Sequence, residues 1–100
     1  MDKYQVLISP KAFRDLDEIY TYIKEELFAE NAALQLVEEI EQAILSLDTM
    51  PYKNPERKVG RYAGQGYRQI FVKNWIIIYR IEENSGIVVI ITVVYMHRNI

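Results

Sequence analysis

The stretch that decides the fold is YRQIFVKNWIIIYRI, residues 67–81. Its first six residues alternate weakly between polar and apolar side chains, and its last seven are mostly isoleucine and aromatic residues, which are typical of β-strands. The pair Lys73-Asn74 between the two parts is typical of a turn. We therefore predict a β-hairpin with strands at residues 67–72 and 75–81.

Two further strands are predicted, one on each side of this hairpin in the sequence. After a turn at residues 82–86, residues 87–95 read IVVIITVVY, a nearly continuous apolar run. Such a run is typical of a central strand that is covered on both faces, or covered by protein on one face and by a partner on the other. Near the N-terminus, residues 4–8 alternate around Gln5, which predicts a short first strand.

Two amphipathic helices are predicted between the first strand and the hairpin. Ser9 is a favourable N-cap, and Pro10 suits the first helical turn. Apolar residues recur at intervals of three and four, at positions 13, 16, 20, 23 and 27 and again at 36, 37, 40, 44 and 47. A break at residues 28–31 separates the two helices, and Asn31 is the expected cap of the second one.

The order of strand, helix, helix and three strands predicts an α+β fold. We expect an antiparallel β-sheet, made of the short N-terminal strand and a three-stranded C-terminal meander, with the N-terminal helical hairpin packed on one face. At 100 residues, the chain is expected to form one domain, residues 1–100.

The composition excludes several classes of function. The chain has no cysteine and a single histidine, His97, which excludes disulfide scaffolds, thiolate zinc sites, cysteine nucleophiles and sites built from several imidazoles. No metal ion, cofactor or small-molecule substrate is expected. No targeting segment is visible, and the apolar stretch at residues 86–96 is shorter than the roughly 20 residues of a membrane-spanning helix. The expected location is the cytoplasm, with no membrane partner.

Charge is distributed unevenly between the two halves of the chain. Residues 1–50 carry four basic and eleven acidic side chains, whereas residues 51–100 carry eight basic and three acidic ones. Four of the basic residues, Lys53, Arg57, Lys58 and Arg61, lie in a segment rich in proline and glycine that reads as a loop. This asymmetry predicts that the basic half meets a polyanion or an acidic partner. The alternative is two oppositely charged surfaces that only maintain solubility.

Four segments of the chain carry a family resemblance: ISPKAFRDL at residues 8–16, the end of the second helix from Ile40 through Leu47 to Pro51, the hairpin at 67–81, and VVYMHRNI at 93–100. In this order and spacing, they resemble the RelE/ParE superfamily of type II toxin–antitoxin toxins, the plasmid stabilisation family. The resemblance covers essentially the whole chain. It implies a growth-inhibiting toxin that a cognate antitoxin binds and neutralises.

Two activities occur in this superfamily, because one branch cuts mRNA on the ribosome and another poisons DNA gyrase without known nuclease chemistry. Metal-independent RNA cleavage needs a base for the 2′-hydroxyl proton, a cation for the phosphate and an acid for the leaving oxygen. The candidates for this chemistry are Arg68, His97 and Arg98. The candidates for binding the target or nucleic acid are Lys53, Arg57, Lys58, Arg61, Lys73 and Tyr95.

One departure from the pattern favours the gyrase-directed, ParE-like branch. The nuclease members place an arginine directly after an aromatic residue and three before the tyrosine of the strand, and that position here is Ile76. The side chain expected to hold the scissile phosphate is therefore missing, and the long helical hairpin also fits the ParE-like branch better. The alternatives are a RelE-like, ribosome-dependent mRNA endonuclease and a non-toxic binding module that shares the fold.

Overall fold

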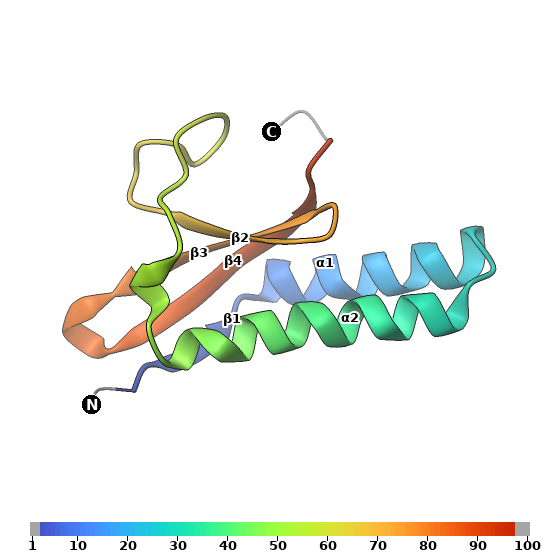
Figure 1. Cartoon of the computed structure of the whole chain (residues 1–100), viewed down its shortest axis with the longest axis horizontal. Coiled ribbons are helices and arrows are strands. Elements are labelled where there is room, and N and C mark those ends of the chain that lie inside the picture. Colours follow the sequence, from blue (N-terminus) through green and yellow to red (C-terminus); the bar gives the residue numbers. More distant parts are fainter. Residues whose placement is uncertain (1–2, 98–100) are drawn as a thin grey trace.

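The computed structural model describes residues 3–97, in which two helices lie along one face of a four-stranded sheet (Figure 1). The strands are β1 (Gln5–Ile8), β2 (Arg68–Val72), β3 (Trp75–Glu82) and β4 (Ile87–Tyr95), and the helices are α1 (Pro10–Thr21) and α2 (Glu30–Leu45). This arrangement confirms the predicted α+β fold and the predicted hairpin, whose strands β2 and β3 differ from the expected bounds by one residue at one end of each. No helix among residues 3–97 is long and apolar enough to cross a membrane.

The sheet is mixed, so the expectation of a wholly antiparallel sheet was wrong for its first strand. The strand order is β1-β4-β3-β2, and β1 pairs with β4 in parallel, from Gln5 opposite Ile87 to Ile8 opposite Ile90. The reason is the direction of the chain. The helical hairpin returns the chain to the start of β1, where the Tyr4 amide donates to the Asp48 carbonyl at 2.8 Å. A three-stranded meander that begins there ends with a strand running in the same direction as β1.

The main core lies between the helices and one face of the sheet. Every second residue of the central strands points to this face, because side chains alternate along a strand. The core residues that are essentially inaccessible to solvent are Ala12, Ile40, Ile44, Leu47, Ile77, Tyr79, Val88 and Ile90. The two helices therefore cover the apolar run predicted for β4. The face of α1 that does so carries Ala12, Leu16 and Ile19. The stripe predicted for this helix was wrong at two of its positions, since Phe13 and Leu27 are more than half exposed.

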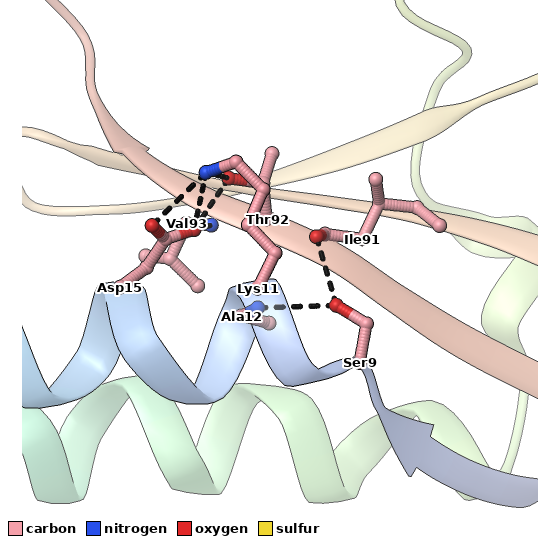
Figure 2. Close-up of polar contacts among 7 residues, drawn as sticks. All are labelled: Ser9, Lys11, Ala12, Asp15, Ile91, Thr92 and Val93. Atoms are coloured by element: carbon pink, nitrogen blue, oxygen red, sulfur yellow. Dashed lines mark hydrogen bonds and ion pairs between the residues drawn. The ribbon is translucent and has the colours of Figure 1, made fainter.

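The start of α1 is attached to β4 by a network of polar contacts (Figure 2). Ser9 caps the helix as predicted, since its hydroxyl accepts from the Ala12 amide at 3.1 Å, and it also donates to the Ile91 carbonyl at 3.0 Å. Ile91 has no partner in the register between β3 and β4, so that it forms a β-bulge. The bulge turns the carbonyl of the extra residue toward the helix cap.

Asp15 of α1 provides the second attachment, one residue beyond the bulge (Figure 2). One oxygen of its carboxylate accepts from the Thr92 hydroxyl at 2.5 Å and from the Val93 amide at 3.0 Å. Lys11 donates to both Asp15 and Thr92 at 3.0 Å. The carboxylate thus provides the hydrogen-bond acceptor for the Val93 amide, which lies on the edge of β4 beyond the last residue of β1, Ile8.

The turn between the helices differs from the prediction in two respects. The first helix continues past α1 as a π-helical turn at Tyr22–Glu26, and α2 begins at Glu30 after Ala29, which forms no side-chain cap. The expected cap by Asn31 is therefore wrong, because Asn31 already lies inside α2. The chain reverses instead at Phe28, whose φ of 52° lies in the left-handed region, and the Ala29 amide closes the turn on the Ile23 carbonyl at 3.2 Å.

Replacing Asp15 with alanine is expected to lower the free energy of unfolding by about 2–3 kcal/mol, because it leaves the half-buried Val93 amide and the buried Thr92 hydroxyl without their acceptor. Denaturation in urea measures this loss. Asp17, which is exposed on the same helix, provides the matched control, and its replacement with alanine should change stability by less than about 0.5 kcal/mol. Equal losses of unfolding free energy in the two variants would show that Asp15 acts only as a negative charge near the start of the helix and not through its contacts with β4.

Candidate functional site

The second face of the sheet, away from the helices, is apolar and is covered by the segment that precedes β2. Ile76, Ile78 and Val94 form a small buried cluster there, and Tyr62 and Tyr67 pack against it. The two tyrosine rings meet edge to face, with their centroids 5.1 Å apart. Figure 1 shows this segment, in yellow-green, standing out on the side of the sheet opposite the helices. The face is thus occupied by side chains of the protein itself.

Arg57 is a buried part of this segment, with only 6% of its surface exposed. Its Nε donates to the Arg61 carbonyl at 2.6 Å, and one terminal nitrogen donates to the Gln69 side chain at 2.8 Å. Its own backbone amide donates to the Tyr67 carbonyl at 2.8 Å. Arg57 was predicted to bind the target, but its guanidinium is directed inward and holds the loop of residues 58–66 on the sheet.

Arg68, at the start of β2, is also directed toward backbone carbonyls. One terminal nitrogen donates to the Asn54 carbonyl at 2.6 Å and to the Tyr52 carbonyl at 3.3 Å, and the guanidinium lies 5.1 Å from the centre of the Tyr52 ring. The other terminal nitrogen is 3.8 Å from the Glu56 carboxylate. These contacts fix the short helical turn at Pro51–Lys53 against the end of the sheet.

Two tyrosines complete the attachment of this turn. The buried Tyr79 hydroxyl donates to the Pro51 carbonyl at 2.6 Å, and burial raises the pKa of Tyr79. The Tyr52 hydroxyl donates to the Glu83 carboxylate at 2.5 Å, and this hydrogen bond raises the pKa of Tyr52. Both phenols therefore stay protonated in the neutral range and serve as donors rather than as bases.

Three cations of the predicted basic set remain available to a partner, and all three lie on the same segment. Lys53, Lys58 and Arg61 are exposed, and within residues 3–97 their side chains form no ion pair. Lys73 is different, since it lies 3.2 Å from Glu39 of α2, on the helix side of the sheet. The predicted basic set is therefore divided between cations that hold the fold and cations that face solvent.

The end of β4 carries a row of aromatic rings. Trp75 contacts Tyr95, and Tyr95 contacts His97, each pair edge to face with centroids 5.2 Å apart. Beside this row, a groove of about 640 Å³ runs between the sheet and the first helix. Its lining residues are Asp15, Glu18, Ile19, Tyr22, Ile23, Leu27, Trp75, Val93, Val94 and Tyr95. Sequence reasoning missed this groove, because it depends on the angle between α1 and the sheet.

Arg68 and His97, both proposed for RNA cleavage, lie toward opposite ends of the strands. Arg68 is aligned with Tyr79 of β3, whereas Tyr95, two residues before His97, is aligned with Trp75. At about 3.3 Å per residue, these two positions on β3 are about 13 Å apart. The structure does not bring the two side chains together, and the third candidate, Arg98, lies outside the described residues.

The fold is shared with solved structures of proteins from toxin–antitoxin systems. The fold is similar to that of the chromosomal ParDE system of Pseudomonas aeruginosa, with a TM-score of 0.79 and 18% identity over 95% of this chain and 98% of the other. The fold is also similar to that of the RelBE2 complex of Mycobacterium tuberculosis, with a TM-score of 0.66 and 19% identity over 93% of this chain and 98% of the other. A mutant of Escherichia coli RelE in the free state has a TM-score of 0.66 and 10% identity over 95% of this chain and 85% of the other.

The family follows from the sequence as well. The model of the ParE toxin of type II toxin–antitoxin system, parDE, matches residues 6–100, and the chain belongs to this family. No curated protein sequence matches the chain. The predicted membership of the RelE/ParE superfamily is therefore confirmed.

Replacing Arg57 with methionine is expected to loosen the loop of residues 58–66, because the Arg61 carbonyl and the Gln69 side chain lose their buried donor. Amide hydrogen exchange in this loop should accelerate by about tenfold or more, while exchange in α2 changes little. The same replacement at the exposed Lys58 is the control and should leave the loop protected. Unchanged amide exchange in the Arg57 variant would show that Arg57 does not hold this loop on the sheet.

Proposed function

We propose that the protein is a gyrase-directed, ParE-like toxin that acts by binding and carries no nuclease chemistry. The observation that carries this proposal is the state of the second sheet face. Ile76 and Ile78 occupy it, and two tyrosine rings cover it. The arginines beside it already donate to atoms of the protein, since Arg57 donates to the Arg61 carbonyl and Arg80, two residues after Ile78 in β3, donates to the Glu82 carboxylate. A phosphate placed there would meet apolar side chains and would compete for donors that hold the loop in place.

The groups that RNA cleavage requires are not assembled on the described residues. Cleavage needs a base and a cation within hydrogen-bonding reach of one phosphate. Arg68 lies toward one end of the strands and His97 follows the other end, and Ile76 takes the position expected to carry the phosphate-binding arginine. These positions support the gyrase-directed activity over the ribosome-dependent endonuclease.

The proposal includes a cognate antitoxin as partner and the cytoplasm as location. The relatives in Pseudomonas and Mycobacterium are toxin–antitoxin systems. In this chain, α1 covers the edge of β4 beyond Ile90 as far as Val93, and the apolar groove opens beside it. Such a groove suits an antitoxin segment that buries apolar side chains against the first helix and the end of the sheet.

The test compares the two target classes with one preparation of protein. The purified chain should inhibit DNA supercoiling by gyrase at near-stoichiometric ratios, and the cognate antitoxin should relieve this inhibition. In a cell-free translation extract, the ends of the mRNA should stay intact. Full gyrase activity at excess toxin, or new mRNA ends that disappear with Arg68→Ala, would contradict the proposal.

The exposed cations should contribute to this activity through long-range attraction to DNA in the gyrase complex. The double variant Lys58→Ala/Arg61→Ala is expected to inhibit gyrase about threefold to tenfold more weakly at low salt, and the difference should shrink as salt increases. Arg14→Ala/Lys24→Ala removes the same charge from the helix side and is the control. A loss that is equal in both double variants, or independent of salt, would argue against a charged contact by this loop.

A further inference from the structure

The tip of the helical hairpin exposes a large aromatic side chain in a strained backbone. Phe28 is 90% exposed, and its φ of 52° is unfavourable for a residue with a bulky side chain. Glycine or asparagine normally occupies this position at the end of a helix, because neither is strained there. Phenylalanine costs stability at this position through its backbone, and its apolar surface, which stays in water, contributes nothing in return.

The tip is also placed so that a partner can reach it. Figure 1 shows the far end of the hairpin, between α1 and α2, extending past the β2–β3 turn along the long axis of the molecule. Tyr22 and Leu27 beside it are more than half exposed. The chain departs from the α-helix here into the π-helical turn at Tyr22–Glu26, and such turns are frequent at functional sites.

The charge around the tip defines the chemistry of the partner. Glu25, Glu26 and Glu30 are exposed on either side of Phe28, whereas the neighbouring cation Lys24 lies over the Tyr20 ring at 5.6 Å. An aromatic anchor within an acidic rim is complementary to an apolar pocket bordered by lysine or arginine. The acidic rim repels nucleic acid, so that the partner is a protein.

We infer that Phe28 is an anchor that inserts into an apolar, basic-rimmed pocket of the protein that the toxin inhibits. Phe28 does not line the groove beside β4, in contrast to Tyr22 and Leu27. The surface proposed for the antitoxin therefore borders this anchor without including the Phe28 side chain. The inference rests on the proposed function only in naming gyrase as the inhibited protein.

The experiment uses Phe28→Gly, which removes the anchor and the backbone strain together. The melting temperature of this variant should rise by about 2–5 °C, because glycine adopts the left-handed conformation without strain. The concentration that half-inhibits gyrase should increase by about tenfold or more, growth arrest in cells should weaken in parallel, and affinity for the cognate antitoxin should stay within about twofold. A more stable protein that has lost activity excludes misfolding as the cause.

Met50 provides a matched control, because it is also exposed and has a φ of 55°. Met50→Gly relieves the same kind of strain elsewhere and should keep full growth arrest. Retained growth arrest in Phe28→Gly, an equal loss in Met50→Gly, or a tenfold loss of antitoxin affinity in Phe28→Gly would each overturn the inference. If the wild-type protein leaves gyrase unaffected but arrests growth, the gyrase proposal fails, and the growth assay alone decides the role of Phe28.

Discussion

The arrangement of helix and sheet depends on one carboxylate, that of Asp15. The pairing of β1 with β4 ends at Ile90, and beyond this point Asp15 attaches α1 to the edge of β4 where a further strand could otherwise pair. Ser9 begins the helix at the point where β1 stops, and Asp15 accepts from the Val93 amide that β1 no longer reaches. The helix therefore crosses the edge of β4. The groove lies where the first helix and the end of the sheet leave space between them, and Asp15 lines one side of it.

Positive charge on the later half of the chain has two separate uses. Arg57 and Arg68 donate to backbone carbonyls and hold an irregular segment against the sheet, which satisfies polar groups that this segment would otherwise bury without partners. Lys53, Lys58 and Arg61 extend from the same segment into solvent. The two arginines that bind the backbone thus give the exposed cations a fixed position. Counting charges along the sequence cannot separate these uses, because both kinds of residue alternate within a few positions.

Local signals predicted most of the fold, and tertiary contacts account for what they missed. The Ser9 cap, the apolar stripe of the second helix and the hairpin at residues 67–81 each depend on residues close by in the sequence, so that the sequence pattern predicts them. The parallel pairing of β1 depends on where a helical hairpin returns the chain, and the bulge at Ile91 depends on contacts with α1. At the hairpin tip, Asn31 is a good capping residue by composition, yet the chain reverses three residues earlier at Phe28. The inward direction of Arg57 likewise follows from the position of Gln69 across the fold.

The bulge in β4 has a consequence for how this strand tolerates changes in length. Val88 and Ile90 face the helices before it, and Val93 faces them after it, because one extra residue separates the two halves of the strand. Deleting Ile91 would remove the bulge and leave the inner and outer sides of the following residues unchanged, because Ile90 and Thr92 would then alternate as in a regular strand. The deletion would instead remove the carbonyl that the Ser9 hydroxyl contacts. The extra residue therefore serves the attachment of α1, whereas the side-chain pattern of the core does not require it.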